Sequence, residues 1–244
     1  MGRGPSIEGR KNAEDAKRAK VFTKLIREIT VATRAGVADP AANPRLRAAV
    51  DKALAANMTK DTIERAIKRG SGADGGAHME ELRYEGYGPA GIALIIECFT
   101  DNPTRTVADV RHALTRHGGN LGTSGSVAFQ FTRCGELVFA TGGDEAAEEK
   151  VLEAALEAGA DDVINENGES TVVCAPESFE AVQQALIGAG LESAHAGVVM
   201  RPNNRVAVPD DALETLHDLL ERLDALDDVS EVYHNAALPA EAAG

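Results

Sequence analysis

The hydrophobic spacing between residues 135 and 201 changes in one particular order, which restricts the chain to few folds. Short alternating or apolar segments are typical of strands, and here they are 136–140, 162–166, 170–175 and 193–200. Two segments with helical spacing separate them, at 144–157 and 178–188. The order strand, helix, strand, strand, helix, strand predicts a ferredoxin-like domain over residues 135–201.

The preceding segment shows a second, incomplete α/β pattern. We expect paired strands at 81–87 and 92–99, a helix that ends at 117–119 and a strand at 126–132. The apolar residues of that last strand would share one face: Val127, Phe129 and Phe131.

Two elements near the end of the chain would complete this pattern. They are an amphipathic helix at 210–226 and a strand at 229–234. We therefore expect a discontinuous middle domain, residues 77–134 and 202–239, into which the ferredoxin-like domain is inserted.

Three helices are expected before residue 71. The first, at 13–35, has one apolar stripe: Phe22, Leu25, Ile26, Ile29 and Ala32. The second begins at Pro44, a residue suited to a first helical turn, and its apolar face would comprise Leu46, Ala49, Val50, Ala53 and Leu54. Thr59 is the expected N-cap of the third helix, which ends at Gly70.

A glycine-rich linker at 71–77 would separate these helices, as a domain of residues 1–76, from the rest. The predicted fold class is α+β. It combines an N-terminal three-helix basic domain with two α/β, ferredoxin-like domains, one of which is inserted into the other.

Charge is divided unevenly along the chain. Residues 1–70 hold sixteen Lys and Arg against eight Asp and Glu, a net charge of +8, whereas the remainder carries −22 and the whole chain −14. A basic segment joined to acidic domains indicates a nucleic-acid-binding arm, because Lys and Arg that neutralise phosphates release condensed counterions. The alternative is a solvated helical surface with ion pairs along the helix.

The bases of the first helix favour nucleic acid. Arg18 projects on the apolar side, one turn before Phe22. The others fall on the opposite, solvent side: Lys17, Lys20, Lys24, Arg27 and Arg34.

A second cationic segment lies near the helix that ends at 117–119. Its bases could contact phosphate, or could simply favour the negative end of that helix. The candidate nucleic-acid-binding residues are Arg10, Lys11, Lys17, Arg18, Lys20, Lys24, Arg27, Arg45, Arg47, Lys60, Arg65, Lys68, Arg69, Arg105, Arg111 and Arg116.

No catalytic or metal-binding motif is found. The chain has neither G-x-S-x-G nor H-E-x-x-H, so we expect no enzymatic activity, no metal and no cofactor. Acidic pairs such as Asp227-Asp228 are interpreted as solvated helix surface. Three widely spaced cysteines and no apolar run of membrane-spanning length indicate a cytoplasmic protein with no membrane association.

The role of two tyrosines has two interpretations. Tyr84 and Tyr87 could stack on bases or pack locally around a Gly-Pro turn. A standard RNA-recognition motif is rejected, because no segment matches its aromatic sheet motif.

Four segments resemble the YebC/PmpR family, which also includes mitochondrial translational activators. They are DAKRAKVFTKLIREI (15–29), NPRLRAAVDKALAANMTKDTIERAIKRG (43–70), YEGYGPAGIALIIE (84–97) and DNPTRTVADVRHALTRHGGNLGTSGSVAFQF (101–131). The resemblance implies three domains, no enzymatic activity, and a role as a DNA-binding transcriptional regulator or a ribosome-associated translation factor. Many members begin Gly-His-Ser-Lys-Trp, whereas this chain begins Gly2-Arg3-Gly4-Pro5-Ser6-Ile7 and lacks that Trp.

Three functions follow as hypotheses. The first is a transcriptional regulator that binds duplex DNA through the basic helices. The second is a translation factor that binds ribosomal RNA. The third is a protein-interaction scaffold with a merely solvated basic face. Ribosomal proteins or the transcription machinery are the protein partners considered, because acidic domains suit basic partners.

Overall fold

The computed structural model describes residues 7–73, 75 and 78–238, with side chains described from residue 16 onward. It contains two compact units. The first unites the described residues up to Ser126 with Pro209–Val232, and the second unites Val127–Val208 with the described residues from Tyr233. The predicted α+β class is confirmed.

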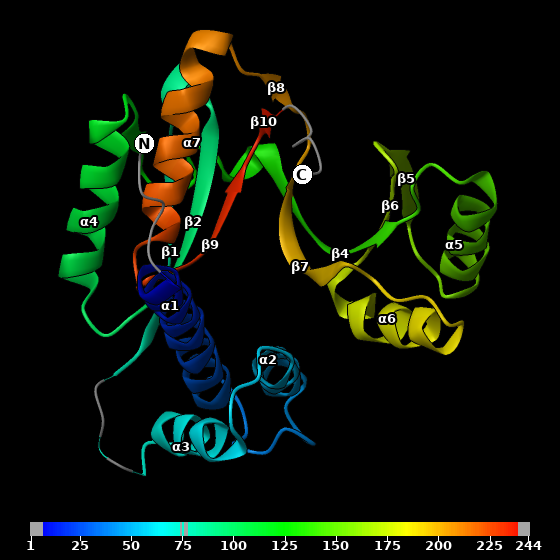
Figure 1. Cartoon of the computed structure of the whole chain (residues 1–244), viewed down its shortest axis with the longest axis horizontal. Coiled ribbons are helices and arrows are strands. Elements are labelled where there is room, and N and C mark those ends of the chain that lie inside the picture. Colours follow the sequence, from blue (N-terminus) through cyan, green and yellow to red (C-terminus); the bar gives the residue numbers. More distant parts are fainter. Residues whose placement is uncertain (1–6, 74, 76–77, 239–244) are drawn as a thin grey trace. The chain divides into compact units, whose positions relative to one another are not determined.

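The first unit begins with three helices, which are α1 (Ile7–Arg34), α2 (Pro44–Ala55) and α3 (Lys60–Gly70) (Figure 1). Side-chain caps define the starts of α2 and α3: the side chain of Asn43 accepts from the Leu46 amide, and that of Thr59, the predicted N-cap, accepts from the Thr62 amide. The three helices enclose a separate core that includes Ile29, Leu46, Ala49, Ala53 and Ile63. We refer to α1, α2 and α3 as the helical bundle.

One residue of the expected bundle core is outside it. The Leu54 side chain is exposed (43%), whereas Leu46, Ala49 and Ala53 are fully buried. At about 100° per residue, Leu54 lies about 80° round the helix from Leu46 and so leaves the buried stripe.

The sheet of the first unit has the strand order β3-β1-β2-β9. Its strands are β1 (Glu80–Tyr87), β2 (Ala93–Thr100), β3 (Asn120–Leu121) and β9 (Val229–His234). Strands β1 and β2 form the predicted antiparallel pair, in which Tyr84 lies opposite Ile96. The two-residue strand β3 was not predicted.

Helices α4 (Pro103–Arg116) and α7 (Asp210–Asp224) pack on this sheet (Figure 1). Their shared core contains Leu94, Ile96, Val110, Leu219 and Leu223. The late elements α7 and β9 therefore share a sheet and a core with β1, β2 and α4.

The second unit has a sheet with the order β5-β6-β4-β7. Its elements are β4 (Phe131–Ala140), α5 (Glu145–Glu157), β5 (Asp162–Glu166), β6 (Glu169–Cys174), α6 (Phe179–Gly188) and β7 (His195–Pro202). Residues Leu137 and Val172 of the sheet pack against Val151 and Val182 of the two helices. A short parallel pair, β8 (Val206–Ala207) and β10 (Ala236–Ala237), also belongs to this unit.

The predicted strand at 126–132 is wrong. Residues Ala128–Gln130 form a 3-10 turn, closed by a hydrogen bond from the Gln130 amide to the Val127 carbonyl. Val127 is fully buried whereas Phe129 is 73% exposed, so the two do not share a face. Strand β4 begins only at Phe131 and continues through the proposed boundary between residues 134 and 135. The three-domain division, with its boundaries near 76, 134 and 201, stays a proposal.

Candidate nucleic-acid interface

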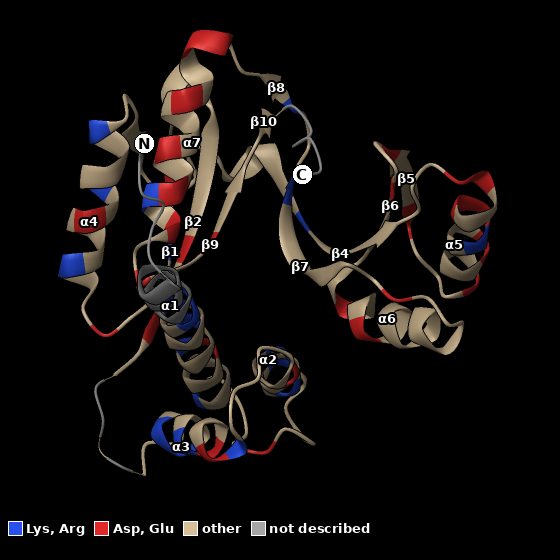
Figure 2. Cartoon of the chain, viewed as in Figure 1, with Lys and Arg blue, Asp and Glu red and all other residues tan. Residues whose placement is uncertain are grey.

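The candidate cations fall into two groups. Those of the first, bonded group bind side chains or carbonyls of other elements of the same unit, and those of the second, exposed group face solvent. Figure 2 shows Lys and Arg along the helical bundle and on α4, whereas α7 and α5 carry many Asp and Glu. In the first unit, several of these cations bind acidic side chains or carbonyls of the same unit rather than facing solvent.

Arg27 belongs to the bonded group. Its Nη1 atom donates to the Phe99 carbonyl at 2.8 Å and forms a short ion pair with the Asp228 carboxylate. The side chain of Arg27 is 17% exposed and that of Asp228 is 8% exposed. The expectation that Arg27 faces solvent is therefore wrong, because α1 packs against the sheet at this point.

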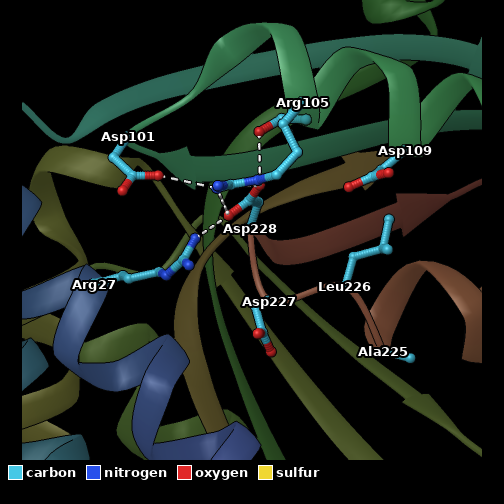
Figure 3. Close-up of a pocket in the computed structure, with 9 residues that line it drawn as sticks. Arg27, Asp101, Arg105, Asp109, Ala225, Leu226, Asp227 and Asp228 are labelled. Carbon is cyan, nitrogen blue, oxygen red and sulfur yellow. Dashed lines mark hydrogen bonds and ion pairs between the residues drawn. The ribbon is translucent and has the colours of Figure 1, made fainter.

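Asp228 also binds α4 (Figure 3). Arg105 donates from Nε to Oδ2 at 3.1 Å and from Nη2 to Oδ1 at 2.9 Å, and Nη2 also bonds Asp101 at 3.0 Å. Thr106 donates from Oγ1 to Oδ2 at 2.8 Å. We call Arg27, Arg105, Thr106 and Asp228 the Asp228 cluster.

The Asp228 cluster holds its carboxylate ionised. Burial alone raises the pKa of Asp228, but hydrogen bonds from Arg27, Thr106 and Arg105 outweigh it and bring the pKa below its ordinary value. The same contact with Asp228 raises the pKa of Arg105. The interpretation of Asp227-Asp228 as a solvated acidic pair is therefore wrong for Asp228, which is buried and binds two guanidinium groups.

An open pocket of about 440 Å³ adjoins the cluster (Figure 3). Its lining residues are Arg27, Asp101, Arg105, Thr106, Asp109, Ala225, Leu226, Asp227 and Asp228. Four carboxylates outnumber two guanidinium groups, so the pocket repels phosphate. Over the described ranges, no group of three or more His, Cys, Asp or Glu side chains could hold a metal ion.

Three further candidates bind within the first unit. Lys24 pairs with Asp224 at 2.6 Å, so it too does not face solvent as expected. Arg45 bonds both carboxylate oxygens of Glu81, at 3.0 and 2.9 Å. Arg47 donates to the carbonyls of the loop before α2, at Pro40 and Ala41.

The exposed group remains available to a ligand. Arg18 lies over the Phe22 ring at 5.3 Å, as its position on the apolar side suggested. Arg65 forms an exposed ion pair with Asp61, which is worth little, and also donates to the Asp61 carbonyl and the Thr62 hydroxyl. Lys68 is exposed but has a partner. The exposed candidates that form no ion pair with another described residue are Lys17, Lys20, Lys60, Arg69, Arg111 and Arg116.

Some candidates lie outside the described side chains. Arg10 and Lys11 are in α1, but their side chains are not among the described ones. The variant N-terminal start, residues 2–6, is outside the described residues altogether.

The two tyrosines pack locally. Tyr84 lies against the core of the sheet, where burial raises its pKa, and the Tyr87 hydroxyl donates to the Ser126 carbonyl at 3.1 Å. Both rings are partly buried by these contacts, which supports the packing interpretation over base stacking.

Two family models cover almost the whole chain. Residues 4–73 match the TACO1/YebC protein N-terminal domain, and residues 79–236 match the TACO1/YebC second and third domain. The chain belongs to the TACO1/YebC family. This confirms the resemblance that the motifs indicated.

Similar members of the TACO1/YebC family extend over the same length. A probable transcriptional regulatory protein of Xanthomonas oryzae pv. oryzae is 58% identical and covers 96% of this chain and 97% of the relative. A probable transcriptional regulatory protein of Stenotrophomonas maltophilia is 55% identical, with 99% of each chain covered. The crystal structure of a conserved hypothetical protein from Aquifex aeolicus shares 42% identity with a TM-score of 0.83, over 93% of each chain.

These relatives place the chain in a family of proteins named as probable regulators. None of the helices in the described ranges combines the length and the apolar character that crossing a bilayer requires.

Proposed function

We propose that this member of the TACO1/YebC family is a non-enzymatic, cytoplasmic, DNA-binding regulator of transcription. One observation carries the proposal: the chain keeps exposed cations on α1, α3 and α4 that no described acidic side chain neutralises. Such side chains can neutralise phosphates and release counterions.

The first half of α1 suits a nucleic-acid groove. All residues from Ala16 to Val21 are exposed, whereas those from Ile29 to Thr33 are all buried. The exposed half carries Lys17 and Lys20, and a major groove about 12 Å wide admits an α-helix. The buried half instead anchors α1 in the helical bundle.

Two observations support the absence of enzymatic activity: the low reactivity of the three cysteine thiols and the names of the relatives. Burial raises the pKa of all three thiols, that of Cys98 to about 12, and thereby keeps them protonated and weakly nucleophilic. The relatives are named as regulatory proteins.

The distribution of the cations favours a second candidate, a translation factor that binds ribosomal RNA. The exposed cations are spread over three helices, and residues 71–244, which include α4, carry a net charge of −22. A folded RNA presents phosphates in several directions, and basic ribosomal proteins beside it would attract the acidic surface.

Crosslinking in cells, followed by sequencing of bound DNA and bound RNA, tests both candidates. The variant Lys17→Glu/Lys20→Glu removes exposed cations without touching Lys24 or Arg27, which bind acidic side chains of the same unit. The control Lys150→Glu makes one such charge reversal at an exposed cation on α5. Promoter peaks that this variant loses and the control keeps support the transcriptional proposal. A ribosomal RNA footprint without promoter peaks contradicts it and supports the second candidate.

A further inference from the structure

One carboxylate joins three distant parts of the chain. Arg27 comes from the helical bundle, Arg105 comes from the first turn of α4, and Asp228 follows α7 (Figure 3). Thr106, next to Arg105 in α4, also donates to the Asp228 carboxylate. The core of the bundle and the core of the sheet share no residue. The polar contacts of Arg27, Lys24 and Arg45 link the bundle to the rest of the first unit between these two cores.

We propose that Asp228 is a positioning residue for nucleic-acid binding, which fixes the exposed cations of α1 relative to those of α4 so that both act as one two-part site. This inference rests on the proposed function. It assigns to Asp228 a positive effect on binding, although its own charge repels phosphate.

The geometry of Asp228 suits this task. Oδ1 accepts from Arg27 and from Nη2 of Arg105, and Oδ2 accepts from Nε of Arg105 and from Thr106. Without the carboxylate between them, the two guanidinium groups would repel each other, and α1 would lose its link to α4.

The other contacts of the bundle do not replace this link. Lys24 pairs with Asp224, whose side chain is 80% exposed, and Arg45 pairs with Glu81 at a surface where both side chains are nearly half exposed. Exposed pairs contribute little, whereas Asp228 is 8% exposed and saturated with donors. Asp228 is thus the best-anchored of these polar links.

A fixed two-part site binds long nucleic acid more tightly than either part alone. Once one part is bound, the second binds as an intramolecular event, and this gain requires that both parts reach the same strand or duplex. A loosened bundle would lose the gain on a long duplex but keep the affinity of each part for a short one.

Fluorescence anisotropy of the full chain with duplex DNA and duplex RNA of two lengths tests the proposal. The lengths are about 10 base pairs, one helical turn, and about 30 base pairs. The test variant is Asp228→Asn. The matched control is Asp227→Asn, which removes the same charge from the adjacent, exposed residue.

We expect Asp228→Asn to weaken binding of the long duplex at least about tenfold and to leave the short duplex unchanged. Asp227→Asn should weaken neither, and Asp228→Glu should restore part of the loss. Tighter binding of both lengths by Asp228→Asn would overturn the proposal, because Arg27 and Arg105 would then be phosphate contacts that Asp228 masks.

A second variant covers the case in which Asp228→Asn does not fold. Arg27→Gln keeps the contact between Arg105 and Asp228 and should show the same selective loss on the long duplex. An equal loss on both lengths would make Arg27 a direct contact and would also overturn the proposal.

The proposed function and this inference fail in different ways. If Lys17→Glu/Lys20→Glu binds both lengths as the unmodified chain does, the nucleic-acid proposal fails. If that variant loses binding while Asp228→Asn keeps the advantage of the long duplex, only the positioning role fails.

Discussion

Arg45 lies over the ring of Phe99, with its guanidinium carbon 5.9 Å from the ring centroid. Its two terminal nitrogens meanwhile bond both oxygens of Glu81. Arg45 comes from α2, while Phe99 and Glu81 come from the sheet, so one side chain joins the helical bundle to the sheet. Its charge is engaged in the fold.

We therefore expect Arg45→Lys to lower stability more than nucleic-acid binding. Lysine cannot form the bidentate pair or stack its head group flat on the ring, so the loss should be about 1 kcal/mol. Urea unfolding measures it. Arg69→Lys, at an exposed cation without a described ion pair, is the control and should leave stability unchanged. A loss of affinity in Arg45→Lys without a loss of stability would contradict the structural role.

The ion pairs of Asp228 predict a pH dependence of stability. Because its pKa is lowered in the folded chain, the ionised group stabilises the fold above its ordinary pKa of 3.8, and this contribution is lost as pH falls through the lower folded value. Asp228→Ala should cost about 3 kcal/mol near pH 7, since it leaves two guanidinium groups without their partner.

Urea unfolding at several pH values measures this difference. The gap between the unmodified chain and Asp228→Ala should stay constant from neutral pH to about pH 5 and shrink below about pH 4. A gap that instead shrinks between pH 6 and 8 would point to a group other than Asp228.

Salt dependence tests the exposed cations of α1. If Lys17 and Lys20 each neutralise one phosphate of duplex DNA, Lys17→Ala/Lys20→Ala should reduce the slope of log K against log salt by about 1.8. Lys150→Ala, on the acidic helix α5, should leave the slope unchanged. Equal slopes in all three proteins would remove these two lysines from the interface.

The loop after α4 approaches β1 closely at Gly119, and a substitution there tests how tightly the two are packed. A Cβ atom at this position would lie 2.1 Å from the Tyr87 carbonyl oxygen, so Gly119→Ala forces the backbone apart and should cost about 2 kcal/mol. Gly188→Ala, in the last turn of α6, meets open space and should stabilise by about 0.5 kcal/mol. Thermal unfolding of both variants provides the comparison, and a neutral Gly119→Ala would show that the loop is free to move.

Periodicity was sufficient for most of the fold. The order of helices and strands follows from local spacing, and the cap at Thr59 follows from side-chain chemistry within three residues. The strand predicted at 126–132 was wrong because three alternating aromatic and apolar residues fit a 3-10 turn as well as a strand. Val127 is buried there, and Phe129 is not.

The candidate site was predicted less well, because its contacts are long-range. Lys24 and Arg27 lie on the polar side of α1, which local spacing cannot distinguish from a solvent side. Their partners Asp224 and Asp228 are about 200 residues away in sequence. The sequence signal that was missed is that Asp228 follows the end of an amphipathic helix, where the chain turns back into the sheet.

Asp228 and strand β9 are made near the end of synthesis, although they complete the unit that α1, β1 and β2 begin. Arg27 and Asp228 are 201 residues apart, so at about 5 to 20 residues per second the ribosome needs roughly 10 to 40 s to supply the partner. During that interval the sheet and helices between Phe131 and Pro202 can fold, while one edge of β2 stays unpaired and the bundle lacks its anchor. Newly made chains therefore pass through a stage with a charged, unlocked N-terminal bundle and an open sheet edge, at which chaperones and proteases have their best access.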